Sequence, residues 1–146
     1  MEQGRVTISC QTADGNVIDL VPEPYSARSR VHEYGGGAFV VDQGKIWFCN
    51  DVDQRIYSCV AGLPPHPLTE KGPLRFADLV VDRQRKRLIA VCEDHSGSGE
   101  PQNLLVSIGF DGSLKRLAWG HDFYAAHKLH PKGDSLAWLS WDHPNM

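Results

Sequence analysis

The stretch ADLVVDRQRKRLIAV, residues 77–91, consists of an apolar run, a polar turn and a second apolar run. β-branched and aliphatic residues dominate both runs, which indicates the two strands of a hairpin rather than a helix. Two further stretches share this pattern and also begin with alanine, at Ala38 and Ala125. Their second strands start at Ile46 and Leu136, so that together with Leu88 the copies are 42 and 48 residues apart.

A repeat of about 40 to 50 residues is typical of the four-stranded blades of a β-propeller. Further hairpins at residues 56–69 and 104–117 supply an outer strand pair after each of the first two copies. The chain opens with an outer pair around Asp14-Gly15, a strong turn signal, and it closes with an inner pair.

We therefore predict an all-β fold: a partial β-propeller of four-stranded antiparallel blades, with two full blades flanked by two half-blades. It forms a single domain over residues 1–146, with blade parts at about 1–30, 31–72, 73–120 and 121–146. The alternative is a generic antiparallel sandwich, which short strands also permit.

Composition excludes several classes of function. The net charge is −3 and the 15 Lys and Arg residues are scattered, so we expect no nucleic-acid partner. The one dense basic run, residues 83–87, is predicted to be a solvated hairpin tip. No apolar run approaches the roughly 20 residues that span a bilayer, and the polar N-terminus does not resemble a signal peptide. With four cysteines that form no C-x-x-C pair, we expect reduced thiols, a cytoplasmic protein and no membrane partner.

Sites for catalysis and for metals are poorly supported. The nearest approach to the nucleophile motif G-x-S-x-G is residues 133–137, which end in alanine and lie in a hairpin rather than at a strand-to-helix turn. Ser135 is therefore predicted to be structural, and the chain to have no catalytic residue. The seven histidines form no convincing three-ligand set, so we expect no metal and no cofactor.

Unusual side chains concentrate in the loops of one predicted face, those that join neighbouring blades and those between the second and third strands of a blade. These loops mix carboxylates, imidazoles, aromatic residues and glycines, whereas the opposite loops are ordinary polar turns. Binding residues concentrate in loops on a rigid scaffold. The candidates for substrate binding or for a domain interface are His32, Glu33, Tyr34, Asp94, Asp142, His143 and Asn145.

Four stretches of the sequence, taken together, are similar to a known protein family: residues 28–37 (RSRVHEYGGG), 93–95 (EDH), 122–126 (DFYAA) and 138–146 (WLSWDHPNM). They resemble the propeller of prolyl oligopeptidase-family serine peptidases, of the dipeptidyl aminopeptidase and acylaminoacyl-peptidase type. The resemblance implies a parent enzyme in which the propeller caps a hydrolase domain with a Ser-Asp-His triad and restricts access to peptides. No hydrolase domain lies within the 146 residues.

The resemblance implies a role for Glu33 in particular, because aminopeptidases of this type hold the free α-amino group of a peptide with propeller carboxylates. A charge-assisted hydrogen bond would supply that interaction. The alternative is that His32, Glu33 and Tyr34 form a structural hydrogen-bond network at the seam between blades. Asp142, His143 and Asn145 face the same choice between a domain interface and a chain turn.

Three functions remain open, of which the third is a propeller enzyme that hydrolyses a small molecule on its own face. In the first, the chain is a non-catalytic propeller segment of a serine exopeptidase that gates access and orients the peptide N-terminus, with the hydrolase domain and a peptide substrate as partners. In the second, it is a stand-alone propeller-like module that binds a protein or peptide. Unpaired strands at both ends also predict a homo-oligomer formed through exposed strand edges.

Overall fold

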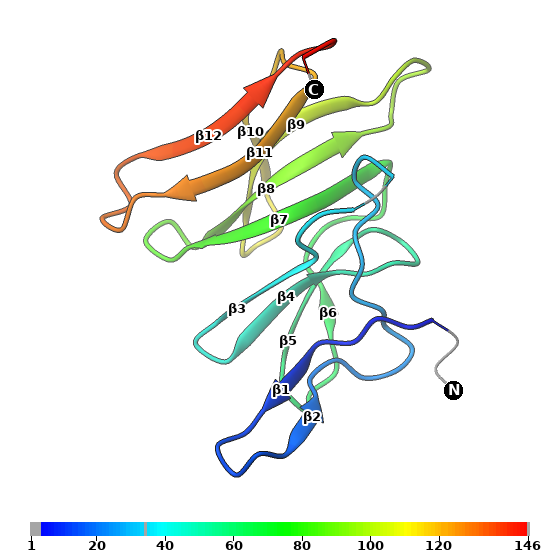
Figure 1. The fold of residues 1–146 in the computed structure, drawn as a ribbon, viewed down its shortest axis with the longest axis vertical. Helices are drawn as coiled ribbons and strands as arrows, with labels where there is room; N and C mark the ends of the chain where they lie inside the picture. Colours follow the sequence, from blue (N-terminus) through cyan, green and yellow to red (C-terminus); the bar gives the residue numbers. More distant parts are fainter. Residues whose placement is uncertain (1–3, 34, 146) are drawn as a thin grey trace.

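The computed structural model describes residues 4–33 and 35–145 (Figure 1). The regular structure in this part of the chain is β throughout. The strands are β1 (Ser9–Gln11), β2 (Val17–Asp19), β3 (Phe39–Asp42), β4 (Lys45–Cys49), β5 (Ile56–Val60), β6 (His66–Pro67), β7 (Leu74–Asp82), β8 (Arg87–Asp94), β9 (Gln102–Gly109), β10 (Leu114–Ala118), β11 (Phe123–Leu129) and β12 (Leu136–Trp141).

The strands form four separate antiparallel sheets. Two are full four-stranded blades: β3-β4-β5-β6, the first blade, and β7-β8-β9-β10, the second blade. They are flanked by two hairpins, β1–β2, the N-terminal half-blade, and β11–β12, the C-terminal half-blade. The predicted partial propeller is therefore confirmed, and the sheets do not close into a ring.

The innermost strand of each blade adjoins the innermost strand of the next. β3 contacts β7, and β7 contacts β11, so these three strands follow one another around the inner side of the arc. The order of strands in each full blade runs outward from this side. β11–β12 is consequently an inner pair and β1–β2, which has no comparable contact with β3, is an outer pair.

The hairpins form where the sequence provides residues that can adopt a left-handed backbone. Gly112, between β9 and β10, has a φ of +86°, and a side chain there would approach the carbonyl oxygen of Leu68 to 2.7 Å. Only glycine satisfies both conditions without strain. This turn therefore also sets how closely the edge of the first blade approaches the second.

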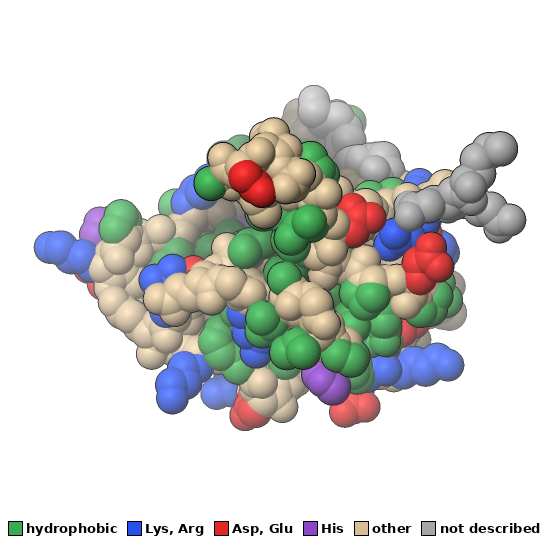
Figure 2. Space-filling view, turned by 90° about the horizontal axis from the view of Figure 1, so that it is seen from below, with side chains coloured by type: hydrophobic (Ala, Val, Ile, Leu, Met, Phe, Trp, Pro, Cys, Tyr) green, Lys and Arg blue, Asp and Glu red, His purple; other side chains and the backbone are tan. Residues whose placement is uncertain are grey.

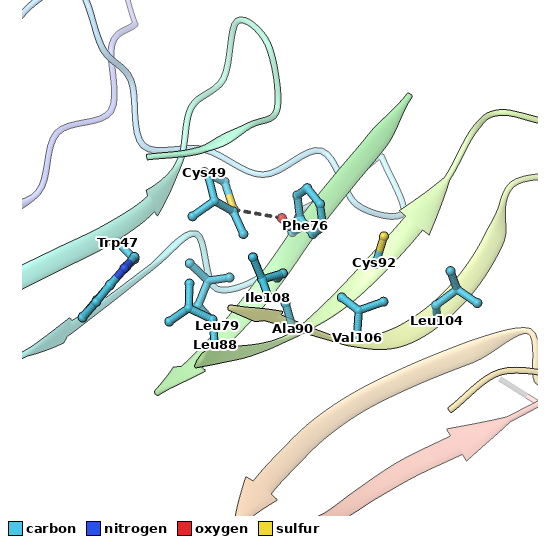
Figure 3. Packing of buried hydrophobic residues seen from close by; sticks show 11 residues of the cluster. Trp47, Cys49, Phe76, Leu79, Leu88, Ala90, Cys92, Leu104, Val106 and Ile108 are labelled. Atoms are coloured by element: carbon cyan, nitrogen blue, oxygen red, sulfur yellow. Dashed lines mark hydrogen bonds between the residues drawn. The ribbon is translucent and has the colours of Figure 1, made fainter. Parts of the chain in front are cut away.

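The core lies between the sheets rather than within any one of them. The largest cluster joins the two full blades: Trp47 and Cys49 of β4 meet Phe76, Leu88 and Ile108 (Figure 3). The Cys49 thiol donates a hydrogen bond to the carbonyl oxygen of Phe76 across this seam, at 3.1 Å. A second cluster packs the N-terminal half-blade on the first blade, and a third packs the C-terminal half-blade on the second.

A β-bulge recurs in two innermost strands. The pairing of β7 with β8 shifts between Ala77 and Val80, and that of β11 with β12 shifts between Ala125 and Lys128. Each bulge contains a residue in the left-handed region, Asp78 at φ 57° and Ala126 at φ 54°. The alternation of the sequence did not predict these bulges.

Within the described residues there is no helix long and apolar enough to cross a membrane.

Candidate functional site

An open cleft of about 1040 Å³ lies at the end of the molecule where loops of the second blade and the C-terminal half-blade meet. Its walls come from the loop before β3, the end of β8 with the loop that follows, and the loops before β11 and after β12. Residues that line the cleft include His32, Glu33, Glu93, His95, Glu100, Asn103, Trp119, His121, Asp122, Phe123 and His143. These are the loops that the sequence predicted to share one face.

The charged side chains of this lining are of one sign. The carboxylates are those of Glu33, Glu93, Glu100 and Asp122, and the described lining residues include no lysine or arginine. Four imidazoles lie among them. At a pH where these imidazoles are neutral, the cleft therefore favours a cationic ligand over an anionic one.

Glu93 is the most buried of these carboxylates, since its side chain is only 7% exposed. One oxygen accepts a hydrogen bond from the backbone N–H of His32, at 3.1 Å. The other lies 2.7 Å from Nε2 of His95 and 3.5 Å from the guanidinium of Arg75. These contacts meet the requirement that a buried charge be paired, and they tie the loop before β3 to the end of β8.

Glu33 lies beside this network but faces solvent. Its side chain is 85% exposed, and one oxygen lies 2.9 Å from Nη1 of Arg75. The hydrogen bond from Arg75, with its positive charge, lowers the pKa of Glu33 below its usual value. The backbone of Glu33 is left-handed, with a φ of 64°, as is that of His32 at 54°. Non-glycine residues keep a left-handed backbone only where the surrounding structure stabilises it. Here the hydrogen bond between His32 and Glu93 contributes to that stabilisation.

A reciprocal pair of contacts closes the other side of the cleft. Asp142 accepts a hydrogen bond from the backbone N–H of Asp122 at 2.8 Å and lies 3.0 Å from Nδ1 of His121. Asp122 in turn accepts from the backbone N–H of His143 and lies 2.9 Å from its Nδ1. The bond to His121 lowers the pKa of Asp142, and the bonds from His143 lower that of Asp122. These contacts fix the entry to β11 against the exit from β12.

Phe123 forms the apolar floor between the two sides. Its ring stacks on Trp141 with centroids 5.3 Å apart, and it also contacts His143 at 4.9 Å and His32 at 5.3 Å. Aromatic rings at these separations attract one another beyond the burial of their area. Phe123 therefore joins the two polar groups of the cleft through its ring.

The structure brings some of the predicted site residues together and leaves others apart. His32, Glu33 and His143 line the cleft, and Asp142 holds its wall. Asp94 is directed elsewhere, accepting from the backbone N–H of Ser96. Asn145 is exposed and caps a turn through its own backbone N–H. Tyr34 lies outside the described residues.

Three residues of the cleft network were missed as candidates: Arg75, Glu93 and His95. Glu93 and His95 occur in a stretch that carried the family resemblance, which is a signal that could have found them. Arg75 lies within β7 and has no such signal. Among the described residues no group of three or more His, Cys, Asp or Glu side chains is placed to hold a metal ion.

Solved structures match this fold along almost its whole length. The crystal structure of a puromycin hydrolase matches 99% of the chain with a TM-score of 0.89 and 31% sequence identity. The predicted resemblance to prolyl oligopeptidase-family peptidases is confirmed. A puromycin-hydrolyzing peptidase of Mycobacterium tuberculosis matches the same share with a TM-score of 0.87 and 34% identity. A mutant of puromycin hydrolase complexed with PGG matches with a TM-score of 0.88.

The chain spans about a quarter of the length of these puromycin hydrolases, because the match covers 25% of each of them. The matched part is the N-terminal domain of the peptidase. No protein-family model and no curated protein matches the chain.

Proposed function

We propose that the chain is a propeller segment of a serine exopeptidase, in which it restricts access to the hydrolase domain and orients the N-terminus of a peptide substrate. The peptide would enter the cleft between the second blade and the C-terminal half-blade. The fold match to N-terminal domains of puromycin hydrolases supports a peptidase parent. The free thiols of all four cysteines support the proposed cytoplasmic location.

The charge balance around Arg75 is the observation that carries the proposed orientation of the peptide. Two carboxylates, those of Glu33 and Glu93, share this one guanidinium, so the group keeps one uncompensated negative charge while the neighbouring imidazoles are neutral. A protonated α-amino group brings one positive charge and three hydrogen-bond donors. Its binding beside Glu33 would neutralise the group without displacing Arg75.

The exposure of Glu33 makes it the carboxylate that a ligand can reach. Glu93 is buried and its oxygens already accept from His32, His95 and Arg75, so it acts as a support for the loop. The Glu33 side chain pairs with Arg75 through one oxygen, and the rest of the carboxylate faces solvent. In this arrangement Glu33 contacts the amine while Glu93 and Arg75 position Glu33.

The test compares a tripeptide that has a free N-terminus with its N-acetylated counterpart, by calorimetric titration of the chain. We expect the free peptide to bind at least about tenfold more tightly than the acetylated one, since charge-assisted hydrogen bonds contribute about 1.5 to 3 kcal/mol. Glu33→Gln should remove this preference. Glu23→Gln, at an exposed position on the N-terminal half-blade, should leave it unchanged.

Equal binding of the two peptides, or a preference that survives Glu33→Gln, would contradict the orienting role. The peptidase parent is tested separately, by translating the gene beyond residue 146. A reading frame that continues into a domain with G-x-S-x-G is the expected result, and an immediate stop codon would leave a stand-alone binding module as the better explanation.

A further inference from the structure

We propose that the contact between β11 and the second blade is sensitive to pH: it is tight while the imidazole of His127 is neutral, and it loosens when that imidazole is protonated. His127 lies in β11, and its Nε2 is 3.3 Å from the carbonyl oxygen of Ile89 in β8. This inference goes beyond the proposed binding of a peptide and does not depend on it.

His127 differs from the other histidines in its burial. The structure describes all seven histidines, and His127 is only 2% exposed, whereas the other six are half-buried or exposed. Imidazoles at the surface are visible in the view from the β1–β2 end (Figure 2). A proton on a surface imidazole is solvated by water, but a proton on His127 would place a charge inside the packed seam.

The hydrogen bonds of the ring fit the neutral imidazole and not the protonated one. A neutral imidazole has one N–H donor and one acceptor nitrogen. Because Nε2 of His127 faces a carbonyl oxygen, Nε2 carries the hydrogen and Nδ1 is the acceptor. Nδ1 is buried and has no hydrogen-bond partner among the described residues. Protonation would add a positive charge and an N–H at this atom, and a buried charge without a partner is costly.

The charged groups that face the ring do not offset this cost. Burial is the largest effect and lowers the pKa of His127 below its usual value. Asp78 of β7 acts in the opposite direction, but its carboxylate already accepts a hydrogen bond from Gly37 N–H at 2.6 Å. Lys128 adds to the effect of burial through its like charge. Strands β9 and β12, which also contact β11, contain no charged residue.

The remaining charged residues of β7 and β8 lie toward the two ends of these strands, and each has a partner of opposite charge. The pairs are Asp82 with Arg87, Arg75 with Glu93, and Asp94 with Arg116. None of these groups is therefore available to neutralise a proton on His127.

Two other histidines near β11 act in the opposite sense. Nδ1 of His121 lies 3.0 Å from Asp142, and Nδ1 of His130 lies 2.8 Å from Asp134. Protonation of these imidazoles strengthens their contacts with the carboxylates, because it converts them into ion pairs. A loosening of β11 at acid pH would therefore be assigned to His127.

The direction of the pH dependence follows from where the proton binds more tightly. An imidazole in water has a pKa of about 6.5, so above this pH the ring is neutral in both the packed and the separated state. As the pH falls below that value, the separated state takes up a proton that the packed state resists. The equilibrium then shifts toward separation by up to about tenfold per pH unit, until the packed imidazole is itself protonated.

Loosening at His127 would reach the cleft through a single strand. Phe123, the apolar floor of the cleft, lies four positions before His127 in β11. Asp122, which precedes the strand, holds the backbone N–H of His143. The packing of β11 on the second blade therefore keeps one wall of the cleft in place, and acid pH is expected to make that wall less ordered.

The experiment measures amide hydrogen exchange of the chain at pH 7 and pH 5, corrected for the intrinsic pH dependence of exchange. We expect the opening equilibrium constant of residues 123–129 to rise at least about fivefold at pH 5. Strands β4 and β5 of the first blade, which contain no histidine, are the internal reference and should show no such rise. His127→Gln should remove the rise, whereas His66→Gln, at an exposed position in β6, should leave it intact.

The comparison between β11 and the first blade uses the unaltered chain, so it decides the question even if His127→Gln does not fold. An equal pH dependence of exchange in both parts of the chain would overturn the proposal. So would a rise in β11 that persists in His127→Gln, because the proton responsible would then bind elsewhere.

Discussion

Ala126 holds a backbone conformation that alanine rarely adopts, with a φ of 54° in the bulge of β11. Its side chain is exposed, so the Cβ atom adds no stabilising packing contact. The corresponding residue of β7, Asp78, has a compensation, because its carboxylate accepts a hydrogen bond from Gly37 N–H at 2.6 Å. The methyl side chain of Ala126 can form no such bond.

Ala126→Gly is expected to stabilise the chain by about 0.5 kcal/mol. The left-handed conformation costs an alanine about 1 to 2 kcal/mol, which glycine avoids. Glycine in turn lowers the stability by about 0.5 to 1 kcal/mol, because it makes the unfolded chain more flexible. Urea denaturation monitored by tryptophan fluorescence measures the change. Ala125→Gly, one residue earlier in ordinary strand conformation, should destabilise it, and a loss of stability in both variants would contradict the argument.

At the scale of single elements, the turn between β7 and β8 depends on one buried carboxylate. Asp82 is fully buried at the end of β7, and its Oδ2 accepts from the side chains of Arg87 at 2.9 Å and Arg85 at 3.2 Å. Burial raises the pKa of Asp82, but the hydrogen bonds from Arg87 and Arg85 outweigh it, so the pKa lies below its usual value. The basic run is the exposed hairpin tip that the sequence predicts. Its arginines also pair with carboxylates: Arg85 and Arg87 bind Asp82, and Arg83 binds Asp42 of the first blade.

Asp82→Asn should therefore destabilise the chain by about 2 kcal/mol at pH 7, because the arginines lose a charged acceptor in a buried site. A carboxylate whose pKa is lowered by folding contributes stability above its unfolded pKa, and that contribution disappears as the pH falls below about 4. The difference between wild type and variant should shrink over the same range. Glu70→Gln, at an exposed position, should show neither effect; a difference for Asp82→Asn that stays constant down to pH 3 would contradict the assignment.

The sequence predicts the blades well because their determinants are local. Alternation and turn residues lie within a dozen positions of each other, as in residues 77–91. The cleft is predictable only in outline, since the sorting of loops by face places His32, Glu33 and His143 together. Arg75 escapes prediction because it contacts Glu33 and Glu93, which are 42 and 18 positions away, and only the packing of blades brings them together. The bulge at Ala126 escapes it because alanine gives no signal for a left-handed backbone.

In the molecule as a whole, the seam between the two full blades contains two thiols, and their reactivity depends on whether the two blades are packed together. Cys49 and Cys92 are both fully buried there. Burial raises the pKa of Cys92 to about 12 and that of Cys49 still further, so neither reacts as a thiolate while the blades are packed together. The rate at which an alkylating reagent modifies these two cysteines therefore measures the separation of the two blades, and no label has to be introduced.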